Sequence, residues 1–388
     1  MDGESEKSYR DFDEYLQQGE PMRRERAEAW GIAIGLQAVD GLKTSDYLLE
    51  TAKRHIEGDI SIDEVKGLID SYYRTKTGHD TPDVDTEEAD KVSTNIAKLL
   101  NEKTFSFSPT GFAAVHGRVF EGVFKFAGEY RDCNLTKKEW VLRGDTVLYV
   151  GYDEIRMALE HDFNQEKEFS YQGLTVAEII RHVAKFISGI WQIHAFREGN
   201  TRATAVFAIK YLRSMGFQIG NELFQKHSWY FRNALVRANY RNVQQGVEPT
   251  LEYLELFFRN LLLSEDSEMK NRKMLVNPPE QWEEQSGKHP TSTRQVPDKH
   301  PTSTRQAEFV CNDLSVRAII NVIGEHQLSV RQILDEMKLK NRENLLHTYL
   351  NPAIEGGWVT QLYPQNSRHP RQKYQLTVKG MAFYRLNQ

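Results

Sequence analysis

Cysteine is scarce in this chain, and its absence excludes two kinds of stabilisation. Only Cys133 and Cys311 occur among 388 residues, far apart and with no CxxC pair or neighbouring histidine. We therefore expect neither a disulfide framework nor a zinc site, and we expect a reducing compartment.

Long apolar segments are also missing. No run approaches the roughly 20 apolar residues that span a bilayer. The first residues, 1–6, are acidic and are not followed by the apolar stretch of a signal peptide. We expect a cytoplasmic protein with no membrane partner.

An excess of positive charge is absent as well. The formal net charge is −5, which excludes a uniformly basic nucleic-acid binder but leaves room for a local basic patch. With 39% hydrophobic and 27% charged residues, the composition is that of a globular protein, and the length predicts two or three domains.

The first region, residues 1–84, is predicted to be a small helical module. Thr44 or Ser45 is suited to cap a helix that runs to about Glu57. Ser61 and Glu64 form a capping box that opens a second helix ending near residue 73.

The central region, residues 85–263, is predicted to be mostly helical. Thr175 and Glu178 form another capping box, and the apolar residues behind them recur at helical spacing as far as His194. A second apolar helix follows Arg202 and ends near Gly216. Before both, residues 140–142 and 146–150 flank an Arg-Gly-Asp turn, a pattern that predicts a β-hairpin.

The last third of the chain divides into a linker and a small domain. Residues 264–311 are polar and proline-rich, and the eight residues 288–295 recur as 299–306, so we predict a flexible linker with a short duplication. Residues 312–388 read as three helices, 314–323, 329–337 and 342–350, and then two strands within 358–363 and 373–378. That order predicts a winged helix-turn-helix.

The richest segment for chemistry is residues 194–202, His-Ala-Phe-Arg-Glu-Gly-Asn-Thr-Arg. Backbone N–H groups at a loop-to-helix junction bind anions, and Arg202 can pair with a phosphate. Glu198 is a carboxylate of the kind that holds Mg²⁺ together with substrate phosphates. His194 can take a proton from an incoming hydroxyl near neutral pH.

This segment resembles the signature of the Fic (filamentation induced by cAMP) family, His-Pro-Phe-x-Asp/Glu-Gly-Asn-Gly/Lys-Arg-x-x-Arg. The resemblance extends through Phe120, residues 127–131, the expected hairpin and residues 229–240, so that it covers about residues 100–263. It implies a mainly α fold: a helical core with a β-hairpin flap, here with the added winged helix. Most similar members transfer AMP from ATP to a hydroxyl side chain of a protein.

The resemblance also implies roles for individual residues. His194 would be the general base and Glu198 would hold Mg²⁺, while Gly199, Asn200 and Thr201 would cradle phosphate and Arg202 would steady the leaving pyrophosphate.

Other implied roles lie outside the motif. The edge formed by Val147, Leu148, Tyr149 and Val150 would dock an extended target segment as an added strand. Tyr230 and Asn239 lie where the family contacts adenine and ribose, with ordinary helix packing as the alternative for both.

The motif departs from the family pattern at three positions. Ala195 replaces the proline, Thr201 replaces a small or basic residue, and Ala205 stands in place of the second arginine, which normally helps to place the γ-phosphate. The preferred nucleotide therefore stays open.

Residues 26–73 resemble the antitoxin-like module found with some Fic domains, whose inhibitory glutamate pairs with that second arginine. Here Asp40, in the segment 36–41, is the one candidate for this role. Because Ala205 has no charge, the usual salt bridge cannot form, and we expect weak or altered self-inhibition.

The sequence thus predicts a protein adenylyltransferase that uses Mg²⁺ and ATP and modifies a Tyr, Thr or Ser of a protein, itself included. The alternatives are a Fic-type transferase with another nucleotide or phosphate-containing donor, and a nucleotide-sensing transcriptional regulator. DNA is a candidate partner of the winged helix, because Arg368, Arg371, Lys373, Lys379 and Arg385 follow Pro364 without an acidic residue.

Overall fold

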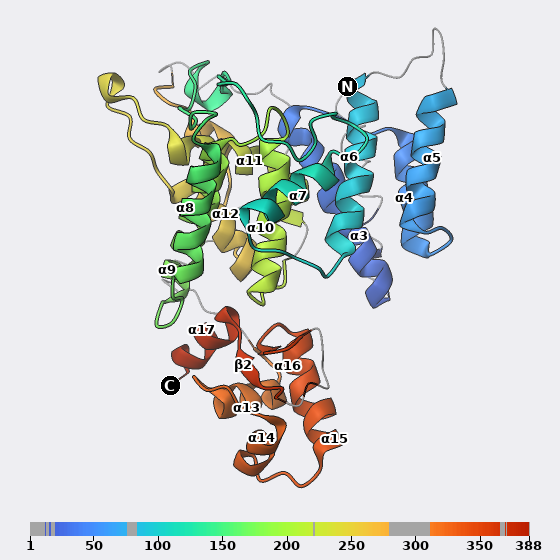
Figure 1. Ribbon diagram of the computed structural model, residues 1–388, viewed down its shortest axis with the longest axis vertical. Helices are drawn as coiled ribbons and strands as arrows, with labels where there is room; N and C mark the ends of the chain where they lie inside the picture. The colour runs from blue at the N-terminus through green and yellow to red at the C-terminus, as the bar shows by residue number, and fades with distance from the viewer. Residues whose placement is uncertain are drawn as a thin grey trace, which may run out of the picture.

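The computed structural model describes residues 12, 15–16, 20–75, 84–219, 222–278, 311–364, 369 and 371–387. These residues are mainly helical, as the sequence predicts, with a single two-stranded sheet among them. Figure 1 shows the N-terminal and central helices side by side in one body, and residues 311–387 in a second body below it.

Two of the N-terminal helices, those that follow Ser45 and Ser61, begin where the local signals predict. The N-terminal elements are α3 (Pro21–Gly35), the short 3₁₀ helix η1 (Leu36–Asp40), α4 (Asp46–Glu57) and α5 (Ile62–Thr75). The Ser45 hydroxyl accepts from the N–H of Leu48 at the start of α4. Ser61 and Glu64 bond reciprocally before α5, so this capping box is confirmed.

Helix α3 is not a separable appendage, because it packs between the central helices α6 and α11. Its Trp30 is fully buried. A Cβ on Gly35 would lie 2.3 Å from the Cα of Gln225, so the backbones of α3 and α11 are in close contact. The Ser228 hydroxyl donates to the Gly35 carbonyl at 2.8 Å. The N-terminal module and the central region therefore share one core.

The central body consists of long helices packed around the chain segment that carries the motif. They are α6 (Val84–Asn101), α7 (Pro109–Val119), α8 (Ile155–Glu168), α9 (Val176–Ile193), α10 (Asn200–Ser214), α11 (Glu222–Asn239) and α12 (Glu252–Leu263). The predicted capping box of Thr175 and Glu178 opens α9, which buries a broad apolar face and ends at His194.

The expected β-hairpin at residues 140–150 is not formed. Trp140–Leu142 is instead one turn of 3₁₀ helix, η2, and residues 145–150 are extended without a partner strand. The physical reason is competition from side chains: the Leu148 carbonyl accepts from Gln192 and the Val150 carbonyl from Arg131. These bonds tie the extended segment to the helical body in place of a second strand.

Packed structure also continues past residue 264, where the sequence predicts a linker. A short 3₁₀ helix, η4 (Asn271–Met274), buries Met274, and the N–H of Val276 donates to the Val141 carbonyl at 2.9 Å. The duplicated segment, 288–306, lies outside the described residues.

The second body holds the three predicted helices and the two predicted strands. Its elements are α13 (Leu314–Ile323), α14 (Val330–Glu336), α15 (Arg342–Asn344) continuing through η6 (Leu345–Leu350) and α16 (Asn351–Glu355), the antiparallel strands β1 (Val359–Gln361) and β2 (Tyr374–Leu376), and α17 (Val378–Leu386). Helix α17 was not predicted; Thr377 caps it by accepting from the N–H of Gly380.

The two bodies meet backbone to backbone at the far end of α10. A Cβ on Gly216 would lie 2.2 Å from the Gly357 carbonyl oxygen, and a Cβ on Gly357 would lie 2.1 Å from the Gly216 carbonyl oxygen. None of the helices described is both long and apolar enough to cross a bilayer.

Candidate functional site

The loop between α9 and α10 is held in place by a buried histidine that the sequence analysis did not single out. The N–H of Gly128 donates to Nδ1 of His116 at 2.9 Å, so the proton lies on Nε2, which donates to the Glu198 carbonyl at 3.0 Å. Burial lowers the pKa of His116 to about 4, which keeps this tautomer neutral at neutral pH. Its ring stacks on Phe196, with ring centroids 3.8 Å apart.

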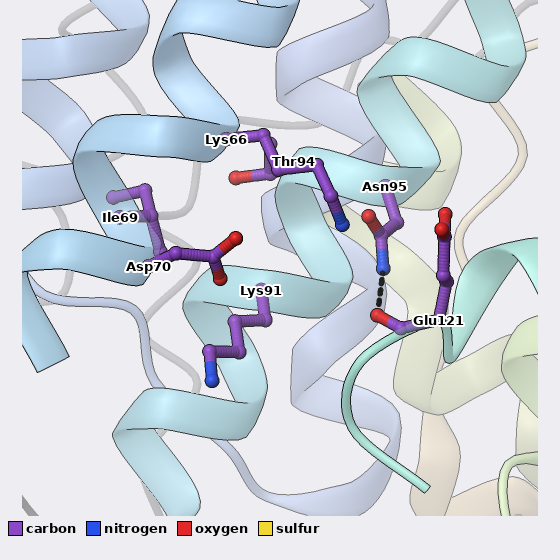
Figure 2. Close-up of a pocket in the computed structure, with 7 residues that line it drawn as sticks. All are labelled: Lys66, Ile69, Asp70, Lys91, Thr94, Asn95 and Glu121. Carbon is purple, nitrogen blue, oxygen red and sulfur yellow. Dashed lines mark hydrogen bonds between the residues drawn. The ribbon is translucent and has the colours of Figure 1, made fainter. Parts of the chain in front are cut away.

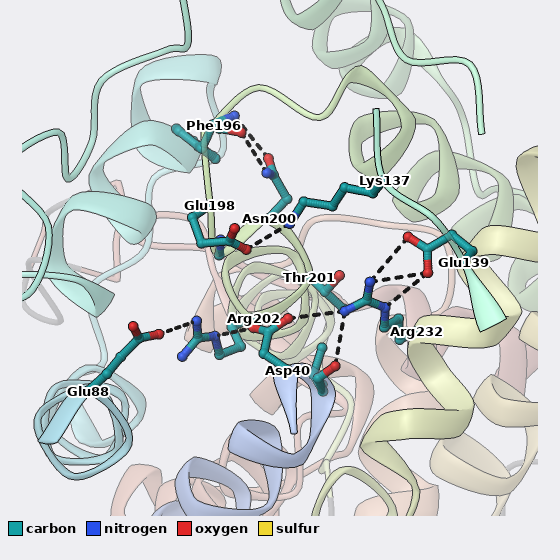
Figure 3. A network of polar contacts seen from close by, with 12 residues as sticks. Asp40, Glu88, Lys137, Glu139, Phe196, Glu198, Asn200, Thr201, Arg202 and Arg232 are labelled. Atoms are coloured by element: carbon teal, nitrogen blue, oxygen red, sulfur yellow. Dashed lines mark hydrogen bonds and ion pairs between the residues drawn. The ribbon is translucent and has the colours of Figure 1, made fainter. Parts of the chain in front are cut away.

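The Asn200 side chain closes the same loop through two hydrogen bonds. Its side-chain oxygen accepts from the Phe196 N–H at 2.9 Å, and its amide nitrogen donates to the Phe196 carbonyl at 2.7 Å. The Asn200 side chain is therefore engaged in shaping the loop (Figure 3), which leaves its backbone N–H for the predicted contact with phosphate.

Gly199 and Thr201 complete the mouth of α10. Gly199 has φ +74°, and a Cβ there would lie 2.1 Å from the Phe120 ring. No side chain caps the helix, so its first N–H groups are available to an anion. The Thr201 hydroxyl accepts from the Trp191 indole at 3.0 Å, a bond that ties the first turn of α10 to α9.

His194, the predicted general base, is buried, with 2% of its surface exposed. The Tyr149 ring stacks on it with centroids 3.9 Å apart, and neither imidazole nitrogen bonds to another described residue. Burial, followed by the charges of Lys137, Arg131 and Arg232, holds the pKa of His194 well below its usual value. The imidazole is therefore neutral at pH 7 and able to accept a proton.

Glu198 is ionised and paired. Burial raises its pKa, but the Lys137 ammonium, the Gly199 N–H and the Arg202 charge together bring the pKa below its usual value. The Lys137 nitrogen lies 2.7 Å from Glu198 Oε1. The residues described contain no group of three or more His, Cys, Asp or Glu side chains that could hold a metal by themselves. Glu198 therefore fits a Mg²⁺ site in which bound phosphates supply further ligands.

Arg202 is buried between two carboxylates and a side-chain amide. Its Nε lies 2.8 Å from Asp40 Oδ2, its Nη2 lies 2.6 Å from Glu88 Oε1, and its Nη1 donates to the Gln37 side chain at 3.0 Å. The guanidinium also stands over the Phe120 ring, 4.8 Å from the centroid. Figure 3 shows Arg202 with Asp40 and Glu88 around the start of α10.

Asp40 has an unexpected partner. It pairs with Arg202, the first arginine of the motif, and its Oδ1 also accepts from Arg232 Nη1 at 3.1 Å. Ala205 is fully buried and carries no charge, so position 205 supplies no cation to the site. The usual salt bridge is indeed absent, and a different one has formed.

Asp40, Glu198, Arg202 and Arg232 line an open cavity of about 590 Å³, within the range of roughly 300–1,000 Å³ that small-molecule sites occupy. Four cationic and four acidic side chains face it, together with a hydrophobic portion: Lys137, Lys138, Arg202 and Arg232; Asp40, Glu88, Glu139 and Glu198; Val39, Leu42, Trp140 and Trp229. A second cavity, between α5 and α6, has a volume of about 10 Å³, about enough for one water (Figure 2).

Two predicted nucleotide contacts, Tyr230 and Asn239, lie in helix packing, the alternative given for both. The Tyr230 side chain is 1% exposed. The Asn239 amide donates to the Ser188 hydroxyl and carbonyl and to the Leu235 carbonyl. Neither faces the cavity, whereas Trp229 and Arg232 on the same helix do.

The predicted docking edge alternates between buried and exposed residues. Val147 and Tyr149 are buried, Val150 is half-buried, and Leu148 is 84% exposed. Tyr149 therefore serves as the cover of His194, and Leu148 is the residue of this edge that faces outward.

Two family models match parts of the chain. Residues 106–212 match the model of the Fic/DOC family, and residues 315–377 match that of the filamentation induced by cAMP protein Fic-like, C-terminal domain. No curated protein matches the chain.

Solved structures similar to the chain include two described as Fic proteins and one described as a translocated effector protein. A Fic family protein from Desulfovibrio desulfuricans G20 is 16% identical, with 96% of this chain and 94% of that chain covered and a TM-score of 0.36. The N-terminal FIC domain of Bep8 from Bartonella sp. 1-1C is 19% identical (49% and 88% covered, TM-score 0.38). BepC from Bartonella tribocorum with bound AMPPNP is 18% identical (48% and 91% covered, TM-score 0.36).

Proposed function

From the Fic domain at residues 106–212, a family whose members are generally transferases, we propose that this protein is an adenylyltransferase. It transfers AMP from ATP, with Mg²⁺, to a Tyr, Thr or Ser hydroxyl of a protein, and its own chain is one candidate acceptor. The observation that carries this proposal is the neutral, unpartnered imidazole of His194 in the loop that also holds ionised Glu198.

The proposed reaction is a displacement at the α-phosphorus of ATP. The acceptor oxygen forms a bond to that phosphorus, the bond to the oxygen bridging the α- and β-phosphates breaks, and pyrophosphate leaves with the bond electrons. An imidazole nitrogen of His194 takes the hydroxyl proton. Because the Tyr149 ring covers that imidazole, the ring has to move before an acceptor reaches it.

Positioning of the phosphates falls to the mouth of α10. The uncapped N–H groups and the helix dipole attract anions, and Arg202 adds a full charge. Glu198 would hold Mg²⁺, which neutralises charge between neighbouring phosphates, after exchanging its ion pair with Lys137.

Asp40 is proposed as the inhibitory group. Its carboxylate now lies against Arg202, at the site where a phosphate would bind, and so competes with the nucleotide. Helix α3 and η1 belong to the shared core, so the N-terminal module does not detach easily. We therefore propose that inhibition is relieved when the Asp40 side chain alone moves aside.

The test uses the full chain with ATP labelled at the α- or the γ-phosphate and intact-mass measurement. We expect an increment of AMP, carrying the α-label only, and a larger yield in Asp40→Ala. The increment should disappear in Asp40→Ala/His194→Ala and persist when the exposed His161 is replaced by alanine. Transfer of the γ-label alone would instead indicate phosphorylation, and ATP binding without transfer would indicate a nucleotide sensor.

A second candidate activity, DNA contact, is supported by the second body. Leu328 pairs with Tyr374 beside β2, as the first strand of a winged helix would, and Arg342, His347, Arg371 and Lys373 are exposed or half-exposed. Lys379 contributes less to a DNA-binding surface than its sequence position suggests, because its ammonium packs 3.9 Å from the centroid of the Trp358 ring. A mobility shift with duplex DNA at two salt concentrations tests this.

A further inference from the structure

Arg232 on α11 is a second guanidinium in the cavity that the motif does not account for. Its side chain is 14% exposed and faces the cavity beside Arg202. The two arginines come from different helices, 30 positions apart in the chain, and meet at a single carboxylate, that of Asp40 (Figure 3).

Each guanidinium is anchored on its outer side by a different acid. Glu139, only 2% exposed, lies 3.1 Å from Arg232 Nη2, and Glu88 lies 2.6 Å from Arg202 Nη2. Asp40 lies on the inner side of both: its Oδ2 forms an ion pair with Nε of Arg202, and its Oδ1 accepts from Nη1 of Arg232. The two arginines are thus held in position by partners other than Asp40, and the space between them suits one anion.

The charge balance points the same way. The cavity wall carries four cationic and four acidic side chains, Asp40 included. Moving Asp40 away leaves an excess of positive charge at the paired guanidiniums, to which the mouth of α10 adds its partial charge. The Asp40 carboxylate now accepts a hydrogen bond from Arg232 and forms an ion pair with Arg202, and a phosphate group in this place would accept from both arginines.

We propose that Arg232 replaces the missing second arginine of the motif: Arg202 and Arg232 together bind the terminal phosphate of a nucleoside triphosphate in the place of Asp40. The inference rests on the proposed function and adds to it a binding residue and a preference for triphosphates. Fully buried Ala205 leaves this charge to be supplied by α11.

The competing explanation is purely structural, because Arg232 Nη1 also donates to the Val39 carbonyl at 3.0 Å and could simply fasten η1. A structural fastener would affect all nucleotides alike. A terminal-phosphate contact would affect ATP and leave AMP unchanged.

The experiment is calorimetric titration of the full chain with Mg²⁺ and ATP, ADP or AMP in the His194→Ala/Asp40→Ala background, which binds without turnover. Adding Arg232→Ala should weaken ATP binding by about ten- to hundredfold, as expected for a lost charged hydrogen bond. AMP binding should stay within about twofold, and Arg232→Lys should restore part of the ATP affinity. Arg241→Ala, at an exposed pair with Glu248, is the matched control and should change nothing.

Equal losses for ATP and AMP, or no loss for ATP, would overturn the role of Arg232 while leaving the transferase proposal intact. Absence of nucleotide binding in every variant, with unchanged melting temperatures, would overturn both. The separate transfer assay distinguishes these cases, since it depends on His194 whether or not Arg232 contacts phosphate.

Discussion

Replacing Gly199 by alanine tests whether this motif glycine serves packing as well as phosphate approach. At φ +74° an L-residue costs about 1–2 kcal/mol. The added methyl would also lie 2.1 Å from the Phe120 ring, and overpacking of this kind costs about 1–3 kcal/mol. Gly199→Ala should therefore lower the free energy of unfolding by about 2–5 kcal/mol.

Gly122 provides a matched control. It has the same φ of +74° and is exposed, and a methyl group added to it would meet no other atom within 4 Å. Gly122→Ala should thus lose only the backbone part, about 1–2 kcal/mol. The double variant Gly199→Ala/Phe120→Leu should recover part of the difference, because the smaller side chain makes room for the methyl.

Urea unfolding followed by circular dichroism compares these variants with the wild type. The reasoning is refuted if Gly199→Ala is no less stable than Gly122→Ala, which would leave phosphate approach as the reason for glycine. In that case nucleotide affinity, and not stability, would fall in Gly199→Ala.

Three further predictions concern the same loop. Because the pKa of His116 is about 4 in the folded protein and about 6.5 when unfolded, the unfolded chain binds more protons between these values, so stability falls as pH falls through them. By pH 5 this loss is about 2 kcal/mol, and His116→Gln, which does not titrate, should lose that much less between pH 7 and pH 5. Tyr149→Ala should uncover His194 and speed its modification by diethyl pyrocarbonate, followed by peptide mass spectrometry. Asn200→Ala should cost about 2–4 kcal/mol in urea unfolding, since it leaves the buried N–H and C=O of Phe196 without partners.

Controls keep these three tests specific. The exposed His161 should react at the same rate in wild type and Tyr149→Ala, and equal rates at His194 would contradict the covering role of Tyr149. An unchanged pH profile in His116→Gln would contradict the buried neutral tautomer. Asn200→Asp should also be destabilised, because a carboxylate cannot donate to the Phe196 carbonyl.

The parts of the fold that the sequence predicted depend on local chemistry. Ser45, Ser61 and Thr175 cap helices through bonds that reach three residues along the chain, so their patterns are readable without the fold. The prediction of a hairpin at 140–150 was wrong. The Val150 and Leu148 carbonyls accept hydrogen bonds from Arg131 and Gln192, and no local sequence pattern reveals these contacts.

The site divides in the same way. The motif predicted which residues would gather at the mouth of α10, but not that Asn200 would be engaged by its own loop. Arg232 is 30 positions from Arg202, and only the packing of α11 and α10 against η1 brings them to one carboxylate. The helical pattern around position 232 does not indicate that Arg232 faces the cavity, and Tyr230, two residues before it, is buried in the core.

The glycine pair at the junction of the two bodies gives α10 a mechanical role. That helix is about 22 Å long at 1.5 Å per residue, with the loop of His194 before its first turn and Gly216 just after its last. Because neither Gly216 nor Gly357 has a side chain, the second body lies directly against one end of a helix whose other end is the proposed reaction centre. Tilting the second body would therefore displace α10, so we expect a methyl group added at Gly216 or Gly357 to shift the His194 loop at the opposite end of the helix.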